Sequence, residues 1–171
     1  MVVLKATRKL AKSLPPTRHA PAASDTALGD WYVNRLVIDR QPLLLLVSAR
    51  SLLAILTPVR DVAALPQRLS ALVASRLKRL GIRADLVAAE MAAMKPVVVA
   101  KTTNRSVVGI MVDYAKMIPY YLPAGGWDAS SLPTVEAMLQ ENPCYAAGPA
   151  DSVIHPDRDT LILLSRRWHA A

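Results

Sequence analysis

The chain has 171 residues, of which 53% are hydrophobic and 20% charged, so it can bury a core and is not intrinsically disordered. Aromatic residues make up only 5% and phenylalanine is absent, so the core must be mainly aliphatic. A formal net charge of +8 favours an anionic partner such as RNA, a nucleotide or an acidic protein. No apolar run approaches about 18 residues, which excludes a spanning helix and argues against a membrane partner.

The first third of the chain is predicted to form strands and turns. Alternation over residues 3–7 predicts a short strand that passes into a basic turn. Residues 15–26 are rich in Pro, Ala and Ser, which is typical of a surface loop. Strong alternation over 31–38, a turn at 39–42 and an apolar run over 43–47 predict an antiparallel hairpin. Residues 51–56 form either a third strand or a short helix capped by Ser51, and the short run before Pro58 favours the strand.

Helical periodicity dominates the rest of the chain. Apolar residues recur at helical spacing over 61–82 and again over 83–96, and residues 97–100 form an apolar run that predicts a buried strand. A third helix is expected over 104–118, ended by Pro119, and two more over 134–142 and 159–170. The sequence therefore predicts one α+β domain over 1–171, an antiparallel β-meander packed against four to five helices, with one additional buried strand at 97–100.

The segment "VVVAKTTNRSVVGIMVDY" places polar residues between the predicted strand and the third helix. Thr102, Thr103 or Asn104 can cap the helix, whose first turn carries free N–H groups and positive partial charge. Charged and hydroxyl side chains beside that turn would hold a phosphate or a carboxylate. The predicted anion-binding residues are Lys101, Thr102, Asn104, Arg105 and Ser106.

Two further residues of this helix have both a structural and a functional interpretation. Arg105, Gly109 and Asp113 are four residues apart and therefore share one helix face. A glycine within a helix costs about 1 kcal/mol relative to alanine, which is understandable if a ligand or a neighbouring element approaches there. The alternative is a structural cap, with Arg105 paired to Asp113 or to a distant acid.

Three segments resemble a family of small bacterial proteins of unknown function. Their patterns are Thr-x-Lys-Leu, Leu-Gly-Asp-Trp-Tyr-x-Asn and Lys-Thr-x-Asn-Arg-Ser-x-x-Gly-x-Met-x-Asp, and this chain carries them at residues 7–10, 28–34 and 101–113. Relatives usually have small or polar residues around Met111, where this chain has Ile110 and Val112. The resemblance implies no activity, but it implies that the three polar segments belong together. It adds Lys9, Trp31, Asn34, Gly109 and Asp113 as supporting residues.

The two adjacent aromatics of the second segment should point to opposite faces of a strand, so one of them is expected to be exposed or at an interface. Trp31 is either a core residue or a platform on which a base stacks. No cofactor or metal motif is present, and the single cysteine, Cys144, permits no internal disulfide or Cys-rich metal site.

These features favour a cytoplasmic, bacterial, antitoxin-like binding or regulatory protein that recognises an anionic partner. The alternative is a small enzyme acting on RNA or nucleotides, such as a toxin-like ribonuclease or transferase. An enzyme should gather Lys9, Asn34, Lys101, Arg105 and Asp113 in a concave pocket with a general base. A binding protein should spread its positive charge over an open face. Either would be compatible with a homo-oligomer.

Overall fold

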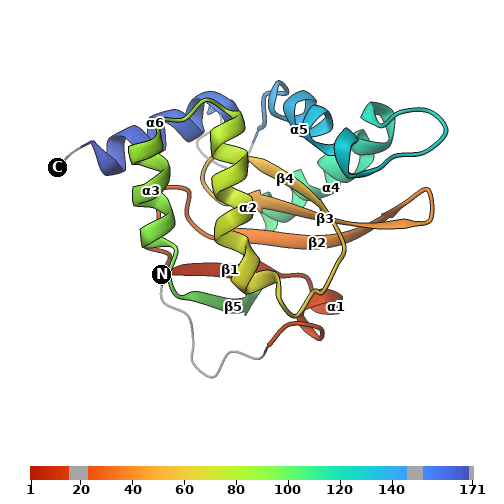
Figure 1. The fold of residues 1–171 in the computed structure, drawn as a ribbon, viewed down its shortest axis with the longest axis horizontal. Helices are drawn as coiled ribbons and strands as arrows, with labels where there is room; N and C mark the ends of the chain where they lie inside the picture. The colour runs from red at the N-terminus through yellow and green to blue at the C-terminus, as the bar shows by residue number, and fades with distance from the viewer. Residues whose placement is uncertain (16–22, 146–151, 170–171) are drawn as a thin grey trace.

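A computed structural model describes residues 1–15, 23–145 and 152–169 (Figure 1). Five strands form one mixed sheet in the order β4-β3-β2-β1-β5. They are β1 (Val2–Ala6), β2 (Trp31–Ile38), β3 (Gln41–Ser48), β4 (Ala54–Pro58) and β5 (Val97–Lys101). The strand alternative for residues 51–56 is therefore confirmed by β4.

Strands β2, β3 and β4 form the expected antiparallel meander. Asp39 and Arg40 join β2 to β3, and both have positive φ angles, of 51° and 64°, as a two-residue type I′ turn requires. Strand β1 lies between β2 and β5 and runs parallel to both. The α+β class is confirmed. Beside the meander, the sheet contains two further strands, β1 and β5, which run parallel to each other and to β2.

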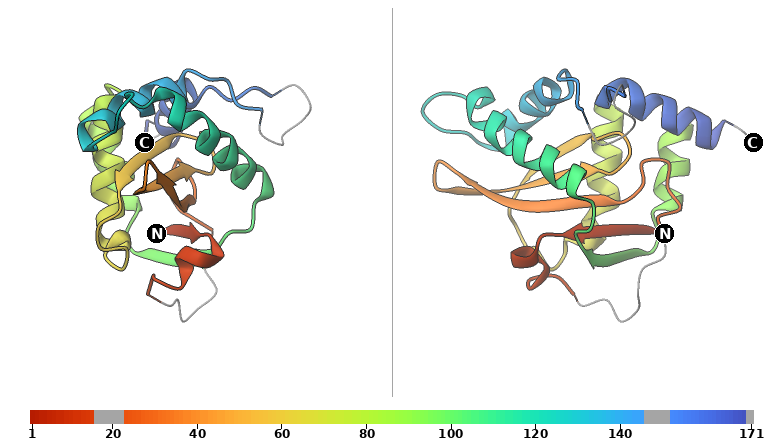
Figure 2. Two further views of the ribbon diagram at one scale, coloured as in Figure 1. Left: turned by 90° about the vertical axis from the view of Figure 1, so that its right-hand side faces the viewer. Right: turned by 180° about the vertical axis from the view of Figure 1, so that it is seen from behind.

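Helices cover both faces of this sheet (Figure 2). Helices α2 (Leu65–Arg79), α3 (Ala84–Ala93) and α6 (Pro156–Trp168) lie on one face, and α4 (Arg105–Tyr121) and α5 (Leu132–Gln140) lie on the other. A short helix α1 (Arg8–Ala11) follows β1, and a 3-10 turn (Ala129–Ser131) precedes α5. Within the described ranges, no helix has both the length and the apolar character needed to cross a membrane.

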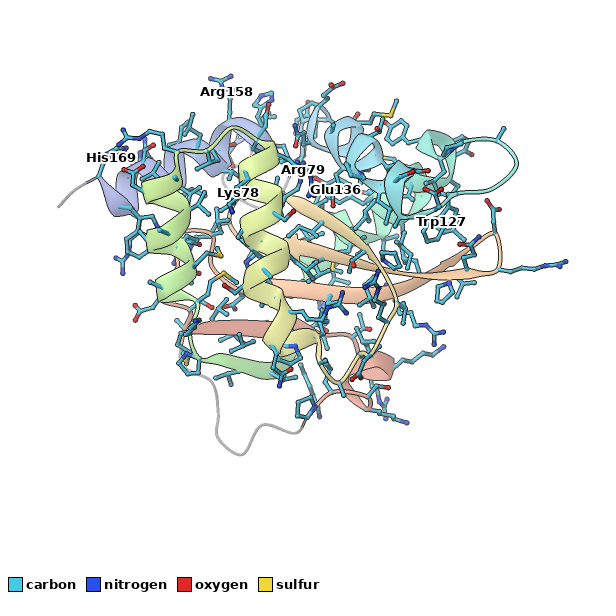
Figure 3. All side chains as sticks on the ribbon, viewed as in Figure 1. Lys78, Arg79, Trp127, Glu136, Arg158 and His169 are labelled. Atoms are coloured by element: carbon cyan, nitrogen blue, oxygen red, sulfur yellow. The ribbon has the colours of Figure 1, made fainter. Side chains whose placement is uncertain are left out.

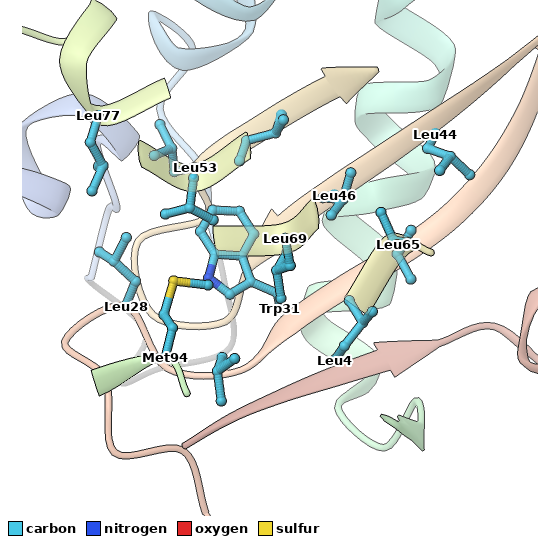
Figure 4. Close-up of a cluster of buried hydrophobic side chains, with 14 of the residues drawn as sticks. Leu4, Leu28, Trp31, Leu44, Leu46, Leu53, Leu65, Leu69, Leu77 and Met94 are labelled. Atoms are coloured by element: carbon cyan, nitrogen blue, oxygen red, sulfur yellow. The ribbon is translucent and has the colours of Figure 1, made fainter. Parts of the chain in front are cut away.

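Each face of the sheet has its own aliphatic core because side chains alternate along the strands. Trp31 enters the core beneath α2 and α3, where Leu28, Leu53, Leu69 and Met94 surround it (Figure 4). Its neighbour Tyr32 enters the other core with residues of α4 and α5. Both aromatics are buried, so the expectation that one of them would be exposed or at an interface is wrong. A strand covered on both faces leaves neither side chain free.

Strand β5 differs from its prediction in burial. Residues 97–100 were expected to form a buried strand, but they are only half-buried, and Lys101 is exposed. The reason is position: β5 is the last strand of the sheet and pairs with β1 alone. An apolar run fits a central strand and an edge strand equally well.

Helix α4 also extends beyond its predicted end. Pro119 was expected to close the helix, but α4 continues to Tyr121. Proline lacks the N–H that would bond to the carbonyl four residues earlier, which costs most inside a long helix. Here Pro119 lies in the last turn, and the bond that closes the helix, from Leu122 N to the Ile118 carbonyl, is made.

The segment predicted as a surface loop at 15–26 lies partly outside the described residues, which omit 16–22. The described remainder is tied to the sheet. Ser24 Oγ accepts a hydrogen bond from Val3 N, and Thr26 is buried. The described end of this segment is a loop with Ala23 and Asp25 exposed, and Ser24 and Thr26 anchor it to the domain.

An ionic group built on the buried Glu136 and Arg76 bonds to the backbone of the edge strand β4. The Glu136 carboxylate of α5 accepts a hydrogen bond from Leu56 N at 2.8 Å and binds Arg79 Nη2 at 2.5 Å (Figure 3). Arg76 Nε lies 3.5 Å from the same carboxylate and donates to the Ala54 carbonyl at 3.1 Å. Burial lowers the pKa of the Arg76 guanidinium, and the charge of Glu136 opposes that effect. This group joins α2, β4 and α5.

Candidate functional site

The N-terminus of α4 is capped by Asn104. Its Oδ1 accepts hydrogen bonds from Ser106 N at 2.9 Å and from Val107 N at 3.4 Å. The helix begins at Arg105, one residue after the start expected from the sequence. Asn104 N donates to the Tyr32 hydroxyl at 3.2 Å, which ties the cap to β2. Of the three candidate caps, the structure selects the asparagine.

Two cations flank this cap. Lys101 is the last residue of β5, Arg105 is the first of α4, and both are exposed. Neither makes an ion pair or a side-chain hydrogen bond with any described residue. Arg105 therefore does not pair with Asp113, which lies on the same helix face beside Lys116. We name Lys101, Thr102, Asn104, Arg105 and Ser106 the α4-start cluster.

Beside this cluster lies a polar group that the sequence interpretation did not identify. Lys5 Nζ forms an ion pair with Asp30 Oδ2 at 2.9 Å, donates to Thr103 Oγ1 at 2.7 Å and lies 5.5 Å from the centre of the Tyr32 ring. Burial lowers the pKa of Lys5, but the hydrogen bond and charge of Asp30 outweigh burial, so its pKa is raised. The sequence signal that could have identified Lys5 was the alternation of Val3, Lys5 and Thr7, which puts these three side chains on one face of the predicted strand.

A pocket opens at the end of β1. Strand β2 continues past that end, because Ala6 pairs with Val33 while β2 runs on to Ile38. Thr7 Oγ1 donates to Asn34 Oδ1 at 3.1 Å across the step. The resulting pocket, of about 610 Å³, lies between α1, the far half of β2 and the segment that follows β4. We name it the β1-end pocket.

The β1-end pocket has basic and apolar walls. Its basic residues are Arg8, Lys9 and Arg35, and its apolar residues are Leu10, Val37, Val59 and Val62. Thr7, Ser13 and Asn34 also line it. Lys9 and Asn34, which came from separate sequence segments, therefore share one pocket.

The pocket and the α4-start cluster are neighbours at the carboxyl ends of the parallel strands β1 and β5. Thr102 N donates to the carbonyl of Ala6, the residue before Thr7. After β1 the chain turns toward the face of α2, whereas after β5 it turns to the opposite face and enters α4. In open parallel sheets, ligands bind where neighbouring strands diverge in this way. Arg105 itself is not among the residues that line the pocket.

Trp31 does not reach either part of this region. Its side chain is fully buried on the face of α2 and α3, whereas Asn34 and Tyr32 belong to the alternate positions of β2. A stacking role for Trp31 would require an exposed ring face. The structure therefore places Trp31 in the core.

A protein-family model described as "Domain of unknown function (DUF6933)" matches residues 3–159. The chain belongs to this family. The matched span includes β1 from Val3 onward, β2 to β5, the β1-end pocket and the α4-start cluster, so the DUF6933 domain contains the whole candidate site. No curated protein and no solved structure matches the chain.

The DUF6933 chain shows no metal centre in its described residues. No group of three or more His, Cys, Asp or Glu side chains there is arranged to hold a metal ion. Cys144 is buried and shares a hydrogen bond with the Tyr114 hydroxyl at 3.2 Å. Burial raises the pKa of the Cys144 thiol, which keeps it in the less reactive protonated form at neutral pH.

Gly109 provides a direct test of the α4 surface. A Cβ built on Gly109 has no neighbouring atom within 4 Å, so the suggestion that a packed strand or helix requires this glycine is wrong. We expect Gly109→Ala to raise the free energy of unfolding by about 1 kcal/mol, because alanine is the better helix former. Urea denaturation followed by circular dichroism measures this change.

The same variant also reports on a ligand. If Gly109→Ala stabilises the protein but weakens anion binding, the glycine leaves room for the ligand. A loss of stability would instead mean that the backbone of α4 needs glycine at this position.

Proposed function

We propose that this DUF6933 protein is a non-catalytic binding protein that recognises an anionic partner through the carboxyl-end surface of β1 and β5. One observation carries the proposal. Arg8, Lys9, Lys101 and Arg105 are exposed at this end of the sheet, and none pairs with a described acid. Cations left without counterions on one surface attract a polyanion.

Phosphate is the group that suits this surface best. Arg105 can present two parallel N–H donors to phosphate oxygens, and Lys101 adds a point charge beside it. Asn104 already satisfies two N–H groups of the first turn, so the side chains carry more of the recognition than the helix backbone. Base stacking is not part of the proposal, because Trp31 and Tyr32 are buried. Because phosphate suits these side chains best, RNA or a nucleotide is preferred to an acidic protein as the partner.

The distribution of charge supports binding over catalysis. None of the described residues lining the β1-end pocket is a His, Asp or Glu that could act as a general base. Asp113 is exposed on α4 beside Lys116, 3.9 Å away, and Asp30 is paired with Lys5. A ribonuclease or transferase role would require a base that faces the bound phosphate. A cytoplasmic, antitoxin-like regulatory protein of a bacterium fits this proposal.

Substitution of Arg105 tests the proposal. We expect Arg105→Ala to weaken binding of RNA or a nucleotide by about 2–5 kcal/mol if the contact is buried in the complex. Arg105→Lys should recover only part of the affinity, because lysine keeps the charge but loses the two-donor fork. Titrations at two salt concentrations, against RNA, nucleotides and the product of the neighbouring gene, measure the effect.

Lys12→Ala is the matched control, because Lys12 is an exposed cation just after α1. It should cost well under 1 kcal/mol and act mainly through long-range charge, which salt screens. Equal losses from Arg105→Ala and Lys12→Ala, both abolished by salt, would mean non-specific electrostatic attraction. The α4-start cluster would then be a helix cap only.

A further inference from the structure

The β1-end pocket combines an apolar interior with basic residues at its rim. Val59 and Val62 are half-buried and Val37 is 64% exposed, so their carbon surface is available in a concave site, with the buried Leu10 beneath it. The volume of about 610 Å³ falls within the usual range for small-molecule sites. An apolar surface left open in this way favours an apolar occupant.

The polar groups of this pocket favour negative charge. Arg8, Lys9 and Arg35 have no ion pair with any residue that the structure describes. The Asn34 Oδ1 accepts from Thr7, and no hydrogen bond from the Asn34 amide N–H₂ is found among the described residues. No acid is among the described residues that line the pocket. Their polar groups are three cations, the hydroxyls of Thr7 and Ser13 and an amide donor, without a carboxylate to neutralise the cations.

The end of β2 adds backbone donors and acceptors to the same place. The Val33 carbonyl accepts from Thr7 N and therefore points toward β1. Backbone groups alternate in direction along a strand, so those of Arg35 and Val37 point to the same side. Strand β1 has ended before these residues, which leaves that side of β2 facing the pocket.

We infer that the β1-end pocket binds a small amphipathic anion, in which an acidic head group is joined to an aliphatic chain. The head group lies against Arg8, Lys9 and Arg35 and accepts from the Asn34 amide. The chain lies against Leu10, Val59 and Val62. The same chemistry is found in medium-chain carboxylates and in alkyl phosphates. No described aromatic side chain lines the pocket, so it offers no ring on which a nucleobase could stack.

This site shares Arg8 and Lys9 with the proposed anion-binding surface but contains no residue of the α4-start cluster, and it does not depend on phosphate recognition at that cluster. The two sites can be tested independently, because Arg105 does not line the pocket and Val37 does.

Isothermal titration of the full chain with octanoate, octyl phosphate, acetate and 1-octanol at low salt tests the inference. Octanoate or octyl phosphate should bind at least about tenfold more tightly than acetate, which lacks the chain, and than octanol, which lacks the charge. The tighter of the two octyl ligands identifies the preferred head group. Affinity that follows the charge alone, or the chain alone, would overturn the inference, as would no binding by either octyl anion.

Two substitutions at one exposed position give the matched control. Val37→Asp places a negative charge in the pocket and should weaken octanoate binding at least about tenfold, whereas Val37→Lys should stay within about threefold of the parent. Val37 is exposed, so both variants should fold, and thermal denaturation checks this. Lys116→Ala, at an exposed lysine of α4 outside the pocket, should leave octanoate binding unchanged. Equal octanoate affinity for the two Val37 variants would place the ligand elsewhere and overturn the inference.

Discussion

Replacing Glu136 with glutamine is expected to lower the free energy of unfolding by about 3–5 kcal/mol. The reason is Arg76, whose side chain is only 3% exposed and which would lose its counterion. Its remaining partners are neutral: the carbonyls of Ala54 and residue 136, and the Gln140 side chain. Thermal denaturation should show a fall in melting temperature of about 6–20 °C, since each kcal/mol corresponds to about 2–4 °C at this chain length.

The exposed pair Arg83–Asp85 gives the control for this loss. Both side chains are more than half exposed, so Asp85→Asn should cost less than about 1 kcal/mol. Adding Arg76→Met to Glu136→Gln removes the stranded charge and should restore part of the stability. If Glu136→Gln costs no more than Asp85→Asn, the carboxylate does not hold α5 to β4.

Trp31→Ala is expected to cost about 3–5 kcal/mol, because the side chain is fully buried among leucines and Met94. Trp31→Phe should cost much less. Phenylalanine keeps most of the ring, and it removes an indole N–H that has no hydrogen-bond partner in the described structure. Urea unfolding curves for the two variants measure these differences.

Tyr120→Ala is the comparison for Trp31, since Tyr120 is an aromatic that is 87% exposed. It should change stability by less than about 0.5 kcal/mol. A Trp31→Ala cost as small as this would mean that the indole is not packed as the structure describes. In that case the stacking role considered for Trp31 would return.

The local elements of this fold could be predicted because they follow from periodicity. Alternation over residues 31–38 predicted β2, and helical spacing of leucines predicted α2. Asn104 was among three capping candidates because its side chain is one of the best N-caps. Each of these features depends on residues within a few positions of one another.

The parts that sequence reasoning missed depend on distant segments. Nothing local indicates that β1 pairs with β5, or that β5 lies at an edge. The β1-end pocket exists because β1 stops at Ala6 while β2 continues, and its walls come from three separate segments. Lys9 and Asn34 could be predicted as site residues from the sequence motifs. Arg8, Arg35 and the valines of the pocket could be assigned to it only once the register of the sheet was known. Their anion-binding role stays a prediction.

The position of β1 has a consequence for how the chain folds as it is synthesised. Its two partners, β2 and β5, are far apart in sequence, with β3, β4, α2 and α3 between them. Until β5 leaves the ribosome, one edge of β1 has no partner, and such edges promote aggregation. Long-range parallel pairing is also slow, because the entropy of closing a large loop is lost before the contacts between the strands can compensate for it. Chains truncated before β5 should therefore be held by chaperones rather than fold alone.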